Sequence, residues 1–169
     1  KNIETSKKGQ YRIKDNFLAF WFRFVYPMRS FIESDHPEIA MTKLKTGFIP
    51  NHVGYVYEDI CRQKMWELNA QGKLPFLFDR VGRWWGGKDT EIDIVAIDTT
   101  DRSKIIFGEC KFHQNVPMQL SELHQLKEKA AVVPWGNANR DEYFALFCIS
   151  GYSEDLQQLA QEDSHLLLM

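Results

Sequence analysis

The chain has 169 residues, of which 44% are hydrophobic and 14% aromatic, so it can bury an ordinary core and is not disordered. It holds no run of about 18 apolar residues and no signal-peptide pattern, so neither a membrane span nor secretion is indicated, and we expect a cytoplasmic protein. The formal net charge of -2 speaks against a dedicated nucleic-acid binder, because phosphate neutralisation usually needs a basic excess. An acidic metal site, however, contributes negative charge of its own. The three cysteines stand singly, without C-x-x-C spacing, and are expected to be buried thiols.

Two helices are predicted in the first part of the chain. Asp15 is a suitable N-cap for a helix over residues 16–25, which is apolar on nearly every face. Pro27 should end or bend this helix. A second helix is expected over residues 37–48, because Gly47 and Pro50 separate it from the element that follows.

A longer helix is predicted from residue 51 or 52 to residue 71, where Gly72 closes it. Its apolar residues recur at helical spacing and should form one buried stripe: Val53, Val56, Tyr57, Ile60, Cys61 and Leu68. Glu58 lies beside this stripe. Two interpretations stay open for Glu58, an inward-facing carboxylate of a functional site or a plain surface glutamate.

Residues 75–81 are predicted to form the first strand, and residues 82–89 a glycine-rich connection. This connection nearly satisfies the P-loop pattern G-x-x-x-x-G-K-[ST], but Asp89 replaces the hydroxyl that would bind magnesium, and a strand follows where a P-loop needs a helix. We therefore expect no ATP site in this chain. Trp84 and Trp85, in the same connection, are suited either to stacking on an unpaired base or to packing.

The most informative stretch is a predicted antiparallel hairpin formed by residues 91–98 and 104–112, joined by a polar turn. In such a hairpin Asp93 comes near Glu109 and Lys111. Alternate residues of a strand share a face, so Glu109 and Lys111 point the same way while the Cys110 side chain points to the other side. Two carboxylates can bind a hard cation through oxygen, and an ammonium group can orient water or balance charge at a phosphate.

The remaining elements alternate between helix and strand. Residues 117–133 are predicted to be a helix with Leu120, Leu123, Leu126 and Ala130 on one side, and Gln125 on the exposed side. Residues 143–150 read as a buried strand, residues 153–162 as a helix and residues 166–169 as a last strand. His113 follows Lys111 by two residues, so it should share its strand face and can contact a phosphate or a ligand water.

The hairpin residues carry a family resemblance. Asp93 followed by Glu109-Cys110-Lys111 resembles the D…(D/E)-x-K core of the PD-(D/E)XK, or restriction-endonuclease-like, superfamily, although Ile92 stands where the proline of that name would be. The predicted order, a helix with Glu58, three strands, a helix and a strand, is also similar to that superfamily's core. The resemblance implies an α/β three-layer fold, with a mixed central sheet flanked by helices and an N-terminal helical extension.

The same resemblance implies a metal-dependent nuclease site. Asp93, Glu109 and the backbone carbonyl of Cys110 would bind Mg²⁺ or Mn²⁺, Lys111 would orient the attacking water, and Glu58 would bind a second metal or its waters. Gln125 is the candidate from the helix that follows the hairpin, and His113 is a further auxiliary candidate.

A second resemblance concerns the start of the chain. Residues 7–27 resemble the junction between a winged-helix segment and the C-terminal domain of archaeal-type, DEXX-box AAA ATPases. This implies an N-terminal segment over residues 1–48 and a nuclease-like domain over residues 49–169. We accordingly expect a fragment of a larger protein, an interpretation with which the absence of an initiator methionine agrees.

Two functional hypotheses follow. The first is a nuclease. The second is a non-catalytic module of nuclease fold that binds DNA or a protein and regulates the ATPase, since a fold does not determine a function. The expected partner is the ATPase portion of the same chain; DNA and a second copy of the chain are further candidates, and no membrane partner is expected.

Overall fold

The computed structural model describes residues 13–86, 90–136 and 139–169. The chain divides into two compact units, Lys1–Val53 and Gly54–Met169. The first residues of the predicted ATPase junction, up to Arg12, lie outside the described part, as do Lys88 and Asp89 of the glycine-rich connection. Within the described ranges, no helix combines the length and apolar character needed to cross a membrane.

The first unit is helical. It contains α1 (Asn16–Phe20), the π-helical turn η2 (Trp21–Val25), the 3₁₀ turn η3 (Tyr26–Met28), α2 (Arg29–Glu33), α3 (Pro37–Phe48) and η4 (Ile49–Val53). Asp15 caps α1 as predicted, since its Oδ1 accepts a hydrogen bond of 2.8 Å from the Leu18 N–H. Pro27 lies within η3, so it bends the helical path instead of ending it.

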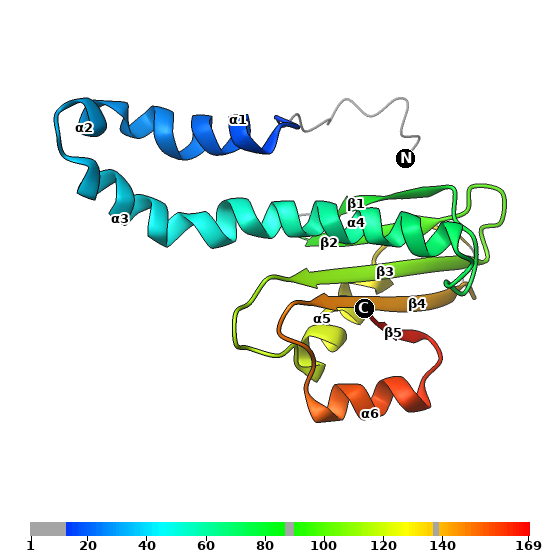
Figure 1. Cartoon of the computed structure of the whole chain (residues 1–169). Helices are drawn as coiled ribbons and strands as arrows, with labels where there is room; N and C mark the ends of the chain where they lie inside the picture. The colour runs from blue at the N-terminus through cyan, green and yellow to red at the C-terminus, as the bar shows by residue number, and fades with distance from the viewer. Residues whose placement is uncertain (1–12, 87–89, 137–138) are drawn as a thin grey trace. The chain divides into compact units, whose positions relative to one another are not determined.

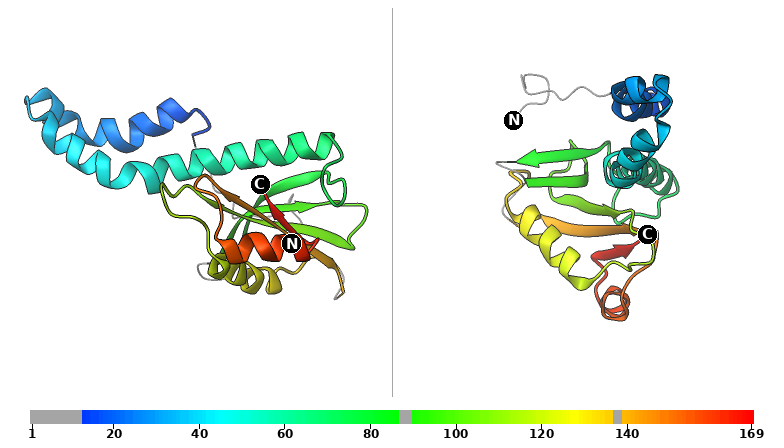
Figure 2. Two further views of the ribbon diagram at one scale, coloured as in Figure 1. Left: turned by 60° about the horizontal axis from the view of Figure 1, so that its bottom comes forward. Right: turned by 90° about the vertical axis from the view of Figure 1, so that its left-hand side faces the viewer.

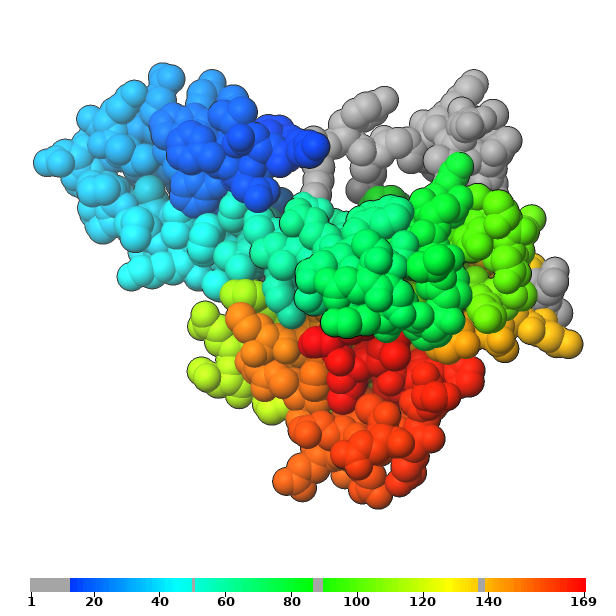
Figure 3. Space-filling model, turned by 45° about the vertical axis from the view of Figure 1, so that its right-hand side comes forward, coloured from blue at the N-terminus to red at the C-terminus, as the bar shows by residue number. Residues whose placement is uncertain are grey.

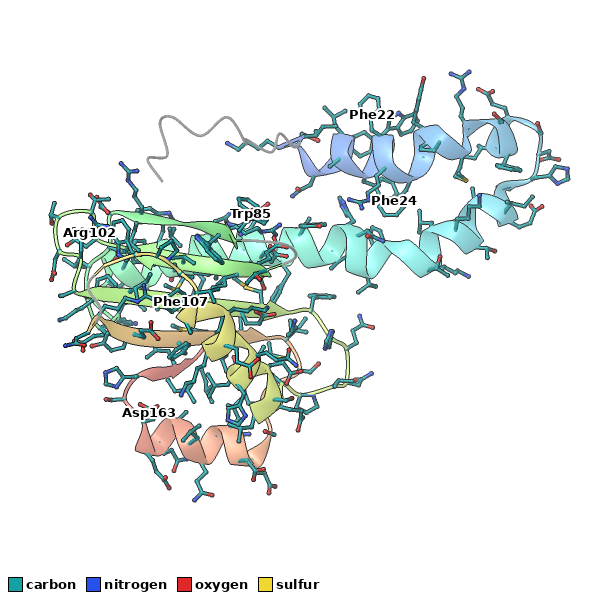
Figure 4. All side chains as sticks on the ribbon, turned by 180° about the vertical axis from the view of Figure 1, so that it is seen from behind. Phe22, Phe24, Trp85, Arg102, Phe107 and Asp163 are labelled. Atoms are coloured by element: carbon teal, nitrogen blue, oxygen red, sulfur yellow. The ribbon has the colours of Figure 1, made fainter. Side chains whose placement is uncertain are left out.

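An aromatic cluster holds the first unit together. Phe20 and Phe24 contact Phe48 edge to face, with ring centroids 5.8 and 6.1 Å apart, and His52 stacks on Phe48 at 5.5 Å. Phe24 points toward this cluster, whereas Phe22 points away from it and is 51% exposed (Figure 4).

The second unit is built around one five-stranded mixed sheet (Figure 1). Its elements are α4 (Gly54–Ala70), β1 (Arg80–Gly86), β2 (Thr90–Ile97), β3 (Lys104–Lys111), α5 (Leu120–Ala131), β4 (Asp141–Cys148), α6 (Glu154–Glu162) and β5 (Leu166–Leu168). The spatial order of the strands equals their sequence order. β1, β2 and β3 pair antiparallel, as the predicted hairpin requires, whereas β3, β4 and β5 pair parallel.

Helices cover both faces of the sheet, so the unit has three layers (Figure 2, right). One core, on the side of α4, contains Cys61, Met65, Ile94, Ile106 and Cys110, among others. The other core, on the side of α5 and α6, contains Phe107, Leu123, Leu126, Leu146 and Leu156, among others. All three cysteines are buried free thiols, as predicted. The mixed α/β class expected from the sequence is therefore confirmed.

The C-terminal strand contributes side chains to the core on the α4 face of the sheet. Leu167 of β5 and Met169 pack against the core beneath α4. In the space-filling view, the red end of the chain accordingly lies next to the teal and green surface of α4 (Figure 3).

The predicted first strand was placed too early in the chain. The strand is Arg80–Gly86, so most of residues 75–81 lie before it. Residues 82–86, predicted to belong to the connection, are part of the strand. Residues near 78 are instead tied to the end of α4, because the Asn69 side chain bonds both the N–H and the carbonyl of Phe78, each at 3.0 Å. A side chain that satisfies both backbone groups removes the need for a pairing strand there.

Candidate functional site

A β-bulge in β2 sets the position of Asp93. Gly82 lies opposite Val95 and Trp84 opposite Ile92, so Arg83 of β1 faces two residues of β2, Asp93 and Ile94. In a regular strand, residues two apart point to the same face. Across this bulge they point to opposite faces, because Ile92 belongs to the core beneath α5 and Ile94 to the core beneath α4.

The pairing of β2 with β3 ends at the same place. Its last register pair is Ile94 with Gly108. The next backbone N–H of β3 on that side belongs to Cys110, and it donates to Asp93 Oδ2 at 2.9 Å. A Cβ at Gly108 would lie 2.8 Å from the Ile94 Cβ, so only glycine allows the two strands this close approach. Asp93 is thereby fixed where β2 and β3 separate.

Glu109 is the most buried carboxylate of the site, with a residue exposure of 5%. Its Oε1 accepts a hydrogen bond of 2.6 Å from Lys111 Nζ, two residues along the same face of β3. Its Oε2 accepts one of 3.1 Å from Lys129 Nζ, in the last turn of α5. The predicted pairing of Glu109 and Lys111 on one strand face is thus present, and Lys129 joins them.

The surroundings of Asp93 and Lys111 raise the pKa of both groups, for different reasons. Burial raises the pKa of the Asp93 carboxyl, and the nearby charge of Glu109 raises it further, although the Cys110 hydrogen bond and the charges of Lys111 and Arg83 act against this. Burial by itself lowers the pKa of the Lys111 ammonium, but the charge and hydrogen bond of Glu109 outweigh it, so the pKa is raised overall. The negative charges of Asp93 and Glu109 therefore repel each other, and the positive charge of Lys111 partly offsets this repulsion.

Glu58 does not join this group. It forms an ion pair with Arg83 of β1, and Arg62 Nη1 lies 3.8 Å from its Oε2. The reason lies in the layering: Glu58 projects from α4, whereas Glu109 lies on the face of β3 that is covered by α5. Arg62 links the two regions, because it donates to the backbone carbonyl of Asp93 at 3.3 Å.

The two auxiliary candidates lie apart from the carboxylates. Strand β3 ends at Lys111, so His113 lies in the loop that follows, is exposed and does not continue the strand face as expected. Gln125 is exposed on α5, one turn before Lys129, which is the α5 side chain that reaches Glu109. Their spacing of four residues places both on one side of the helix, a signal in the sequence that pointed equally to Lys129.

The described part of the former glycine-rich connection is structured by its tryptophans. Trp84 packs against the core beneath α5, whereas Trp85 is 51% exposed and donates from Nε1 to Glu91 at 3.0 Å. Trp85 lies on the edge strand β1 (Figure 4). Residues 82–86 thus form a strand, and the expected absence of ATP binding stays a prediction.

The donor chemistry of the site fits one hard cation better than two. Asp93 and Glu109 supply carboxylate oxygens. The Cys110 carbonyl points to the same side of β3 as its N–H, and therefore toward Asp93. No group of three or more His, Cys, Asp and Glu side chains with metal-binding geometry is present among residues 13–86, 90–136 and 139–169. Asp93, Glu109 and the Cys110 carbonyl are therefore the oxygen groups that could hold a hard cation here, while Glu58 is paired with Arg83.

The model of the DUF234 family, archaeal and bacterial proteins of unknown function, matches residues 21–130, which include Glu58, Asp93, Glu109, Lys111 and Lys129. The chain belongs to the DUF234 family. DUF234 is known as a C-terminal domain of archaeal ATPases, which agrees with the resemblance seen at the start of the chain.

One curated relative of this DUF234 chain is an uncharacterised protein of Methanocaldococcus jannaschii. The two are 35% identical over 142 residues, which cover 83% of this chain and 31% of the relative. The chain therefore spans about a third of the length of the curated relative that it matches. No solved structure matches the chain.

Proposed function

We propose that the second unit is a metal-dependent nuclease that hydrolyses phosphodiester bonds of DNA. The observation that carries this proposal is the juxtaposition of Asp93 and the Glu109–Lys111 pair at the point where β2 and β3 separate. Strand separation at a bulge exposes backbone and side-chain oxygens that a continuous ladder would occupy, and bulges are frequent next to active sites.

Each residue has a distinct role in the proposed site. Asp93, Glu109 and the Cys110 carbonyl would hold Mg²⁺ or Mn²⁺, which supplies Lewis acidity and an activated water. Lys111 is held beside Glu109 by a charge-assisted hydrogen bond of 2.6 Å, so its position is defined before substrate binds. From there its ammonium orients the attacking water and balances the charge of the phosphate.

The proposed fold is restriction-endonuclease-like. Its support is the order of the elements, α4, three antiparallel strands, α5 and the parallel strand β4, together with helices on both faces of the sheet. The proposed setting is the C-terminal end of an ATPase, with the ATPase portion of the same chain and DNA as partners. Assembly with a second copy is a further proposal.

A specific observation supports an alternative function. Both oxygens of Glu109 are already paired with lysines, and Glu58 is paired with Arg83, so these charges already satisfy one another. A module that binds DNA or a protein and regulates the ATPase without cutting would need no more than this. The two proposals differ in one measurable property, the affinity of the site for a divalent cation.

Metal binding should raise the melting temperature of the protein. A ligand that binds only the folded state stabilises it by about 2.7 kcal/mol at 100 times its dissociation constant. In a chain of this size about 2 to 4 °C follow for each kcal/mol. Thermal denaturation with increasing MgCl₂ or MnCl₂ should therefore show a rise of several degrees, and Asp93→Asn or Glu109→Gln should abolish it.

The metal-free protein provides the control. Because the folded state raises the pKa of Asp93, its contribution to stability is present at acidic pH and is lost as pH rises through the folded pKa. Asp93→Asn should therefore be more stable than wild type at neutral pH in EDTA, and equal to it at low pH. Asp98→Asn should have the opposite effect and be less stable than wild type at neutral pH, since the Thr100 hydrogen bonds lower the pKa of Asp98. An unchanged melting curve with metal, together with a destabilised Asp93→Asn, would favour the regulatory module.

A further inference from the structure

Glu109 has a separate ammonium group on each of its carboxylate oxygens. Lys111 Nζ lies 2.6 Å from Oε1 and Lys129 Nζ 3.1 Å from Oε2. The Glu109 side chain is 7% exposed, whereas those of the two lysines are 30% and 31% exposed. Both lysines therefore reach the carboxylate from the solvent side.

The charges of the four side chains cancel. Asp93 and Glu109 carry two negative charges, and Lys111 and Lys129 carry two positive ones. A cation that binds Glu109 competes with the two ammonium groups for its oxygens, because positive charges gathered at one carboxylate repel each other. Each displaced ammonium then needs a new negative partner, and the phosphate of a nucleic acid is such a partner.

Lys129 is better suited to this exchange than Lys111. Its contact with Glu109 is longer by 0.5 Å, the difference between 3.1 and 2.6 Å. It also comes from a separate element, α5, so its rotation disturbs neither β3 nor the bulge. Lys111, in contrast, is also attracted by the charge of Asp93, which helps to keep it in the site.

We propose that Lys129 is a second cationic residue of the site, which neutralises Glu109 in the metal-free protein and contacts a nucleic-acid phosphate once a divalent cation takes its place. This inference rests on the proposed nuclease function. It makes Lys129 a nucleic-acid-binding residue whose availability depends on metal binding. The metal-free protein would then bind nucleic acid without the help of Lys129.

The first arm of the test measures metal affinity without substrate. The dissociation constant for Mn²⁺ is obtained from thermal denaturation or calorimetry for wild type, Lys129→Gln and Lys129→Arg. Lys129→Gln should bind Mn²⁺ about fivefold more tightly, since the competing ion pair is gone. Lys129→Arg, which keeps the charge, should stay close to wild type. Lys127→Gln is the matched control, because Lys127 lies on the same helix but over the Phe144 ring.

The second arm measures the binding of a labelled single-stranded DNA oligonucleotide over a range of salt concentrations. In Ca²⁺, which takes the same oxygen ligands, the slope of log K against log salt should be smaller by about 0.7 for Lys129→Gln than for wild type. In EDTA the two slopes should agree. If Lys129 had only a structural role, Lys129→Gln would change the salt slope equally in Ca²⁺ and in EDTA.

The outcomes separate this inference from the proposed function. If wild type binds Mn²⁺ in an Asp93-dependent way but Lys129→Gln changes neither the affinity nor the slope in Ca²⁺, the role of Lys129 is refuted and the nuclease proposal stands. If neither wild type nor Lys129→Gln binds Mn²⁺, both are refuted. If only Lys129→Gln binds Mn²⁺, Lys129 excludes the cation and does not exchange with it. That result refutes the inference and places the wild-type chain with the regulatory module.

Discussion

Lys111→Gln is expected to lower the rate of phosphodiester cleavage by about 10²- to 10⁴-fold, the range for loss of a positioned proton-transfer or water-orienting group. Metal-induced stabilisation should persist, because Asp93 and Glu109 remain. The combination is diagnostic, since a variant that merely unfolds would lose both properties. Lys111 lies at the end of β3, where its removal leaves the sheet pairs of that strand intact.

The measurement is single-turnover cleavage of labelled DNA in Mn²⁺, with the melting temperature followed in parallel. Lys104→Gln is the control, because Lys104 begins the same strand at the opposite end. Equal cleavage by Lys111→Gln and wild type would show that this ammonium has no role in the reaction. Loss of the metal effect in Lys111→Gln would instead show that the lysine holds the metal site together.

Arg83→Gln is expected to lower the free energy of unfolding by about 3 to 5 kcal/mol, which is typical when one partner of a buried ion pair is removed. The Arg83 and Glu58 side chains are only 12% and 14% exposed. Arg83 also pairs with Glu91 at 2.8 Å and lies over the Tyr55 ring at 5.0 Å. Its loss would leave Glu58 with the more distant Arg62 alone.

A double-mutant cycle with Glu58→Gln tests this account of Glu58. The double variant should recover much of the stability lost in Arg83→Gln, because no buried charge is then left unpaired. Urea denaturation of the four proteins gives the coupling energy. Glu58→Gln alone should leave the Mn²⁺ affinity unchanged; a large loss of that affinity would restore Glu58 as a metal ligand.

Local patterns in the sequence were sufficient to predict most of the fold. Alternation and β-branched residues predicted the β2–β3 hairpin, and α3 matches the predicted residues 37–48. The buried face of α4 was predicted only in part. Ile60, expected in the apolar stripe, is 53% exposed, whereas Asn69 is buried. Hydrophobicity alone misses Asn69 because its amide is satisfied by the backbone of Phe78.

The site shows where local patterns stop being sufficient. The spacing of Glu109 and Lys111 fixed their shared face, since strand geometry is local. The bulge that orients Asp93 is a property of pairing between β1 and β2, and no single strand encodes it. The partners of Glu58 and Glu109 depend on which layer each helix occupies. Helical spacing placed Lys129 on the same side of its helix as Gln125, but only the structure shows that Lys129 pairs with Glu109 and Arg83 with Glu58.

The most direct test of the proposed function is incubation of the purified chain with single- and double-stranded DNA in Mn²⁺, beside Asp93→Ala. We expect cleavage products from the wild type, their loss in EDTA and their absence with Asp93→Ala. No products from a folded wild-type chain that binds Mn²⁺, or equal products from Asp93→Ala, would contradict the assignment of Asp93, Glu109 and Lys111 as a nuclease site.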